Sequence, residues 1–72
     1  MEAMQKIQYV TYCEGDYVVA RGLNLEISSF GSTEEDAAQN FQEAVALYFE
    51  DSVVEALTPA TDIRAREFAI NA

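Results

Sequence analysis

The segment from residue 31 to residue 48 constrains the fold of this chain more than any other. It begins with a glycine that ends a strand-like run, and a capped amphipathic helix follows directly. Ser32 is a good N-cap residue, and Glu35, three positions later, completes a capping box. We therefore expect one main helix with a single buried face. The apolar residues at the spacing of such a face are Ala37, Phe41, Ala44, Val45 and Tyr48.

The opposite face of this expected helix is acidic and carries no basic residue. The apolar stripe cannot continue in phase, because that would turn Asp51 and Glu55 toward the core. The helix should therefore end near Glu50, a further turn or two in a new phase should follow over residues 52–57, and Pro59 excludes helix much beyond it. The side chains expected on the exposed face are Glu35, Gln39, Gln42, Glu43, Ala46 and Glu50.

Three strand-like runs precede the helix, and one follows it. Residues 6–12 and 17–21 are rich in β-branched and aromatic residues, and the turn residues 14–16 between them predict a hairpin. Residues 27–30 predict a short third strand, and residues 62–70 predict a last one. The order β-β-β-α-β predicts an α+β two-layer sandwich, in which a small antiparallel sheet packs on one main helix.

The length of the chain, 72 residues, fits a single domain covering residues 1–72. A chain this short buries only about 60% of its unfolded surface, so it needs extra support from a disulfide, a metal or a partner. Cys13 is the only cysteine and there is no histidine, so neither an internal disulfide nor a zinc site is expected. A homo-oligomer or a second protein remains, and an unpaired last strand is the natural dimer edge. The apolar residues of that edge are Ile63, Ala65, Phe68 and Ile70.

Charge is distributed unevenly along the chain. The basic residues are Lys6, Arg21, Arg64 and Arg66, and the carboxylates between Gly22 and Ile63 equal the whole net charge of −9. A negative surface repels phosphate backbones, so direct nucleic-acid binding is not expected. Such a surface attracts basic partners and speeds their encounter. The alternative is an acidic surface that serves only solubility.

Few residues suit catalysis. Cys13 has Glu14 and Asp16 close by, and negative neighbours make a thiol a poor nucleophile. Asp16, Glu26 and Glu67 are the alternative, because three carboxylates in one place could hold magnesium in a nuclease. No convergent set of groups is evident, so we expect no catalytic residue, no metal and no cofactor. Four aromatic residues suit either base stacking or, as we expect, sheet packing: Tyr9, Tyr12, Tyr17 and Phe30.

The N-terminal residues 1–6 lead into an alternating segment and not into a long apolar one. We therefore expect neither a signal peptide nor a membrane span. A single free thiol is typical of the cytoplasm, which is the expected compartment.

Several short motifs follow one another between Tyr9 and Asp51. Their order and spacing resemble the HicB family of antitoxins, in which a "dG-Tyr-x-Ala" hairpin and a leucine-containing loop precede "Gly-x-Thr-x-Glu-Glu-Ala" and a helix with "Glu-Ala-x-x-Leu/Tyr". The loop at residues 22–26 lacks the prolines usual in the family, and Asp36 stands where alanine is usual. The matching residues are Gly15, Asp16, Tyr17, Val18, Val19, Ala20, Leu23, Gly31, Ser32, Thr33, Glu34, Glu35, Ala37, Glu43, Ala44, Leu47, Tyr48 and Glu50.

This resemblance implies a HicB-like fold, of the dsRBD-like or partial RNase H-like type, and a non-enzymatic antitoxin. Its partner would be a small basic HicA-like toxin, an mRNA-cleaving ribonuclease with a catalytic histidine. Longer members append a DNA-binding domain; this chain ends at Ala72, so direct operator binding is not expected. The alternative is an orphan member that self-assembles through its edge strands. The expected partner contacts are Asp16, Tyr17, Glu26, Glu35, Gln39, Gln42, Glu43 and Glu50.

Overall fold

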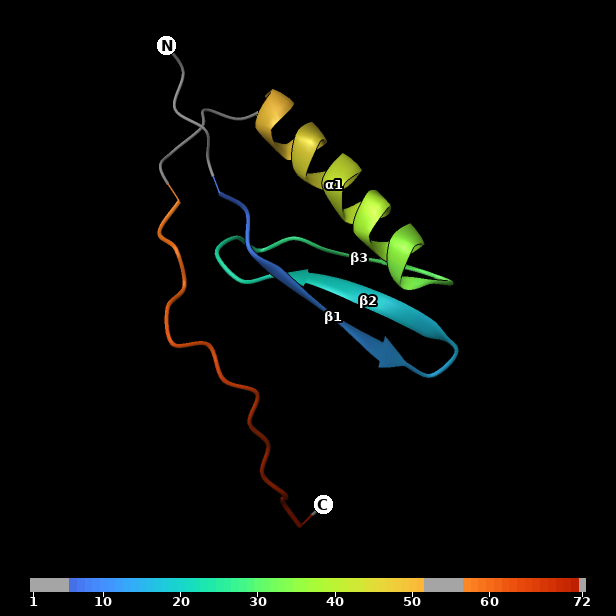
Figure 1. The fold of residues 1–72 in the computed structure, drawn as a ribbon, viewed down its shortest axis with the longest axis vertical. Coiled ribbons are helices and arrows are strands. Elements are labelled where there is room, and N and C mark those ends of the chain that lie inside the picture. Colours follow the sequence, from blue (N-terminus) through green and yellow to red (C-terminus); the bar gives the residue numbers. More distant parts are fainter. Residues whose placement is uncertain (1–5, 52–56, 72) are drawn as a thin grey trace.

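The computed structural model describes residues 6–51 and 57–71 of the chain (Figure 1). A three-stranded antiparallel sheet in the order β1-β2-β3 carries one helix on one face. This is a small α+β domain with the predicted order β-β-β-α. The further helical turn expected after Glu50 falls largely on residues 52–56, which lie outside the described residues. The elements are β1 (Tyr9–Glu14), β2 (Tyr17–Gly22), β3 (Ser28–Gly31) and α1 (Glu34–Asp51).

The first two strands form the predicted hairpin, in which Glu14 pairs with Tyr17 across a two-residue turn. Gly15 takes a φ of 62° in this turn, a backbone conformation that tight hairpin turns require and that glycine adopts at little cost. Tyr12, Val19 and Phe30 are directly opposite one another on the three strands. Because paired residues share one face of a sheet, this row lies on a single face.

The helix begins one residue later than the capping box predicted. Thr33, and not Ser32, is the N-cap, because the Asp36 amide donates to the Thr33 hydroxyl at 3.1 Å. The Ala37 amide donates to the Thr33 carbonyl at 2.9 Å, which is the first helical hydrogen bond. The Ser32 hydroxyl instead donates to the Asp36 carboxylate at 3.0 Å. The first-turn acid that serves the cap is therefore Asp36, and Glu35 is left exposed to solvent.

The core lies between α1 and the sheet. The buried side chains at its centre are Ala20 of β2 and, on the helix, Ala37, Phe41 and Val45. The ring of Tyr9 stacks on Phe41 with centroids 4.8 Å apart, which places Tyr9 on the helix side of β1.

The predicted stripe is correct except at its C-terminal end. Tyr48 was expected in the core but remains 49% exposed, whereas Phe49 packs against the core. The buried stripe continues by steps of four residues from Phe41 through Val45, and the next such step reaches Phe49.

The predicted last strand over residues 62–70 is wrong. These residues have no strand structure and are exposed; Figure 1 shows them running away from the helix and sheet. Gln8 holds the preceding segment, since its side-chain amide donates to the Ala60 carbonyl at 3.1 Å and accepts from the Ala60 amide at 2.7 Å. Asp62 then takes a left-handed φ of 54°, which interrupts an extended run. We call residues 61–71 the C-terminal segment; its apolar side chains belong to no edge strand in this chain: Ile63, Ala65, Phe68 and Ile70.

Candidate functional site

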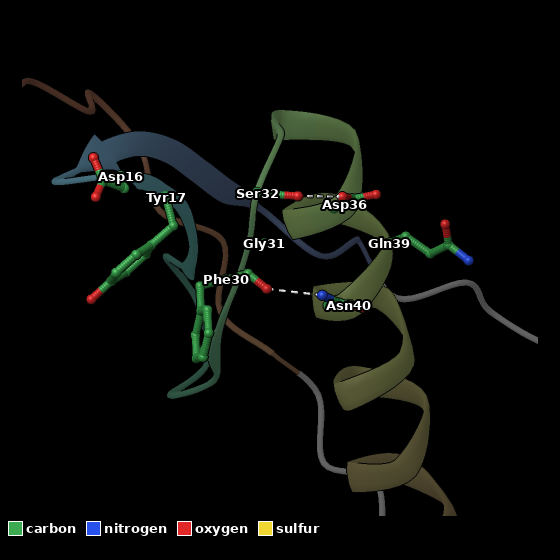
Figure 2. Close-up of a pocket in the computed structure, with 8 residues that line it drawn as sticks. All are labelled: Asp16, Tyr17, Phe30, Gly31, Ser32, Asp36, Gln39 and Asn40. Carbon is green, nitrogen blue, oxygen red and sulfur yellow. Dashed lines mark hydrogen bonds between the residues drawn. The ribbon is translucent and has the colours of Figure 1, made fainter.

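An open hollow of about 530 Å³ lies where the hairpin turn, β3 and the first turns of α1 meet (Figure 2). We call it the hairpin–helix hollow. It combines aromatic rings, carboxylates and amides from segments that are far apart in the sequence. The residues that line it are Asp16, Tyr17, Phe30, Gly31, Ser32, Asp36, Gln39 and Asn40.

Gly31 allows β3 and α1 to approach closely enough to form this hollow. A Cβ atom at residue 31 would lie 2.6 Å from the Cβ of Asp36 and 2.7 Å from the backbone nitrogen of Ala37, which is too close for any larger residue. The side-chain amide of Asn40 donates to the Phe30 carbonyl at 2.8 Å, and Figure 2 shows this bond between helix and strand. The strand and the helix are thus joined directly beside the hollow.

Two aromatic rings form the sheet side of the hollow. Tyr17 and Phe30 lie with ring centroids 5.4 Å apart and planes tilted by 48°. Phe30 is 63% exposed and Tyr17 is 44% exposed. Exposed aromatic side chains of this kind offer a large, rigid contact area at low entropic cost and are enriched in protein interfaces.

The polar groups of the hollow favour a cationic or hydrogen-donating ligand. Asp16 and Asp36 contribute carboxylates, and Gln39 contributes an amide. None of the described residues that line the hollow is basic. A side chain such as lysine or arginine could place its charge near the carboxylates and its methylene stem along the rings.

The structure brings together three of the predicted partner-binding residues and separates a fourth. Asp16, Tyr17 and Gln39 line the hairpin–helix hollow. Glu26 is exposed in the loop between β2 and β3. The antiparallel pairing places that loop at the opposite end of the sheet from the hairpin turn (Figure 1). Glu26 therefore does not belong to the hollow.

The other predicted residues lie along the helix, and all are exposed. At about 1.5 Å per residue, Glu50 lies about 22 Å along the axis from Glu35, so these side chains form a long strip and not a compact site. Gln42 also borders a second hollow of about 220 Å³, beside Tyr9 and Phe41. We call the strip the acidic helix face; it consists of Glu35, Gln39, Gln42, Glu43 and Glu50.

Sequence reasoning missed five of the eight residues that line the hollow: Phe30, Gly31, Ser32, Asp36 and Asn40. Phe30 was assigned to sheet packing, and Ser32 was assigned to the helix cap. The sequence did contain a usable signal, namely the short connection between the expected strand at residues 27–30 and the helix. Because only residues 31–33 join them, the strand must run beside the first turns of the helix. Asn40 then lies within reach of the strand, although its partner depends on the tertiary arrangement.

The described residues provide no group that could hold a metal ion. Histidine, cysteine, aspartate and glutamate form no group of three or more that could hold a metal ion in the described parts of the chain. In particular, Asp16, Glu26 and Glu67 do not come together as the magnesium-site alternative requires. Cys13 is exposed and forms no disulfide.

Comparison with known proteins finds no matching family model, no matching curated protein and no matching solved structure. Within residues 6–51 and 57–71, no helix has the length and apolar character needed to cross a bilayer. The geometry of the surface therefore carries the functional argument.

Proposed function

We propose that this chain is a non-enzymatic, HicB-like antitoxin that binds a small basic HicA-like ribonuclease toxin and masks its RNA-binding surface. The family part of the proposal rests on the motifs between Tyr9 and Asp51. The order β-β-β-α is compatible with that family. Cytoplasmic localisation is part of the same proposal, because the toxin acts on mRNA.

The acidic helix face is the single observation that carries this proposal. Glu35, Glu43 and Glu50 are exposed along α1, and the helix contains neither lysine nor arginine to neutralise them. A ribonuclease binds phosphates through clustered basic side chains. Carboxylates fixed on a rigid helix compete for those side chains and accelerate the encounter of the two proteins.

The hairpin–helix hollow supplies the short-range part of the interaction. Tyr17 and Phe30 present exposed rings beside Asp16 and Asp36. Interfaces gain most of their energy from a few aromatic or arginine anchors that are desolvated in pockets. The hollow suits one basic anchor of the toxin, while the helix face aligns the remaining charge.

The test is a titration of the purified chain into a catalytically inactive HicA-like toxin encoded beside its gene, followed by calorimetry. Glu43→Lys should weaken binding by about tenfold or more, since close interfacial charge pairs contribute about 1.5 kcal/mol or more. Glu43→Lys/Glu50→Lys should weaken it further and should fail to rescue growth when the active toxin is expressed.

Asp62→Lys is the matched control, because it makes the same change of charge on an exposed residue away from the helix. Its affinity should stay within about threefold of the unchanged chain, as expected for a charge outside an interface. Equal losses of affinity from Glu43→Lys and Asp62→Lys would mean that only net charge matters. Absence of any small basic neighbour that binds would contradict the antitoxin proposal itself.

A further inference from the structure

No helix or strand of residues 6–51 and 57–71 covers the face of the sheet away from α1. Tyr12 and Tyr17 are 40% and 44% exposed on this face, and Phe30 is 63% exposed. Figure 1 shows the helix on one side of the sheet only. β1 is also an edge strand, because its only strand partner in the described chain is β2.

The backbone groups of β1 that point to its open edge can be identified. The backbone N–H of Gln8 donates to the side-chain oxygen of Asn24, and the backbone carbonyl of Gln8 accepts from the Leu23 amide. Both partners lie in the loop that follows β2, so the backbone groups of Gln8 point away from the open edge. Successive residues of a strand direct these groups to opposite edges. Tyr9, Thr11 and Cys13 therefore present their N–H and C=O groups at the unpaired edge.

The C-terminal segment is extended but pairs with no strand of its own chain in the described residues. Phe68 is 89% exposed and Ile70 is 74% exposed. Residues 63–65 border a hollow of about 390 Å³ whose other lining residues are Val10, Thr11 and Tyr12 of β1 and Leu23 of the loop after β2. The chain's own segment therefore leaves space beside the edge of β1.

We propose that two copies of this chain form a dimer in which the C-terminal segment of each pairs antiparallel with β1 of the other. In one register, each residue of the segment that lies on the helix-free face meets a β1 residue of compatible chemistry. Arg66 lies opposite Glu14 as an ion pair, Phe68 lies opposite Tyr12, and Ile70 lies opposite Val10. Phe68 extends the row of Tyr12, Val19 and Phe30 across a fourth strand.

The positions of these pairs suit strong contacts. Val10 and Tyr12 direct their backbone groups toward β2, so their new partners occupy non-hydrogen-bonded positions. Side chains lie closest at such positions, and aromatic, aliphatic and opposite-charge pairs all stabilise a sheet there. The small residues Ala65 and Ala69 then lie on the helix side of the sheet, next to β1. Of the three strands, β1 is the one that α1 covers least.

A parallel alignment does not reproduce this match. If Phe68 lies beside Tyr12 with both strands running in the same direction, Arg66 lies beside Val10 and Ile70 lies beside Glu14. Each of these pairs sets an apolar side chain against a charge. The chemistry of the segment therefore selects the antiparallel direction.

The chain's own segment cannot reach the antiparallel register. Ala60 is fixed beside Gln8, and residues 63–65 then follow β1 in its own direction toward Tyr12. Ala60 to Arg66 contains as many residues as Gln8 to Glu14. Even a fully extended segment therefore only just brings Arg66 to Glu14 of the same chain. No residues remain between them to form a turn that would reverse the direction of the segment, so the antiparallel strand must come from a second copy.

Two-fold symmetry closes this arrangement. Each segment runs with its own β1 and against the partner's β1, so the two β1 strands are antiparallel to each other. A reciprocal exchange of this kind is isologous: both copies use the same surfaces, and the open edge of each β1 is paired. It supplies the additional burial that a domain of this size needs.

The native Cys13 allows a direct test of the register. In the proposed pairing Glu67 lies opposite Cys13, at a Cα separation of about 5.5 Å that a disulfide can bridge. Glu67→Cys should therefore shift most of the oxidised full-length chain to twice its mass on a non-reducing gel. Peptide mapping should find the link between Cys13 and residue 67 of different chains.

Arg66→Cys is the matched control, because residue 66 points to the other face and should not link to Cys13. Glu67→Cys/Cys13→Ser should lose the specific link. A Cys13-to-67 bond within one chain, equal cross-linking by Arg66→Cys, or no cross-linking by Glu67→Cys would overturn the proposal. So would sedimentation of the unchanged chain as a monomer at high concentration.

The dimer is independent of the proposed toxin, since it is measured on the chain alone. Phe68→Asp should convert the dimer to a monomer in sedimentation equilibrium. Glu43→Lys should leave the dimer unchanged, because Glu43 lies on the exposed face of α1. Failure of toxin binding and failure of dimerisation are thus separate results.

Discussion

The two faces of the sheet have very different surroundings. On the helix side, Ala20 and Phe41 are almost completely buried, whereas Tyr12 and Phe30 on the other side keep 40% and 63% of their surface exposed. Both faces are built from the same three strands by simple alternation. Within the described residues α1 covers one face only, and on the other face Val19, flanked by Tyr12 and Phe30, is the one side chain that is buried.

This difference separates folding from association. Phe41 is the only large side chain among the described residues that is fully buried, so the helix-side core depends strongly on it. The helix-free face contributes less to folding, because its rings stay 40% to 63% exposed and Val19 is its one buried side chain among the described residues. We expect mutations on the two faces to differ in size and in their dependence on protein concentration.

Phe41→Ala should have the largest effect. Truncation of a buried phenylalanine costs about 3–5 kcal/mol, which in a domain this small approaches the whole free energy of unfolding. Urea denaturation followed by circular dichroism should show loss of the folded baseline or a strongly lowered midpoint. A cost below about 1 kcal/mol would mean that α1 does not bury this face, and the contrast between faces would disappear.

Gly31→Ala should have the next largest effect, because it tests how closely α1 approaches β3. The added Cβ would lie 2.6 Å from the Asp36 Cβ, and overpacking of this kind costs about 1–3 kcal/mol. Ser29→Ala is the control, since it changes a neighbouring residue of β3 without adding bulk. Equal midpoints for both variants in urea would show that the helix can move away freely.

The sequence was sufficient for the elements that depend on local pattern. Alternation predicted the hairpin, and the stripe from Ala37 to Val45 predicted the buried side of α1. The exchange of Tyr48 for Phe49 could not be predicted, because it depends on how far the sheet extends beneath the helix. The last strand failed for a related reason: residues 62–70 have strand-like composition but no edge within reach in the required direction.

The candidate site was predicted only in part. Asp16, Tyr17 and Gln39 were proposed as contacts, and the structure places them around one hollow. Phe30 and Asn40 belong there because of the packing of β3 against α1, which no local pattern encodes. Glu26 was grouped with them by charge alone, although strand pairing sends its loop to the other end of the sheet. The binding role of all these residues stays a prediction.

Thr33→Ala should have a smaller effect on stability, and it tests which residue is the N-cap of α1. The Thr33 hydroxyl accepts from the Asp36 amide, and loss of an N-cap of this kind costs about 1 kcal/mol. Ser32→Ala removes only a hydrogen bond between two exposed side chains, so it should change the unfolding free energy by less than about 0.5 kcal/mol. The opposite ranking in thermal melts would restore Ser32 as the cap.

Phe30→Ala should have the smallest effect on the folding of the isolated chain and is the direct counterpart of Phe41→Ala. Full burial of such a side chain is worth about 1.5–3 kcal/mol, and Phe30 loses only about a third of its surface, so the expected cost is about 0.5–1 kcal/mol. Urea unfolding at low concentration, where the chain is monomeric, should show this small loss. At high concentration the loss should stay about the same, because Val19 and Tyr12 separate Phe30 from the partner copy's Phe68 in the row. Tyr12→Ala, which removes the ring opposite Phe68, should instead lose more stability at high concentration. A Tyr12→Ala loss that does not change with concentration would mean that the helix-free face takes no part in association.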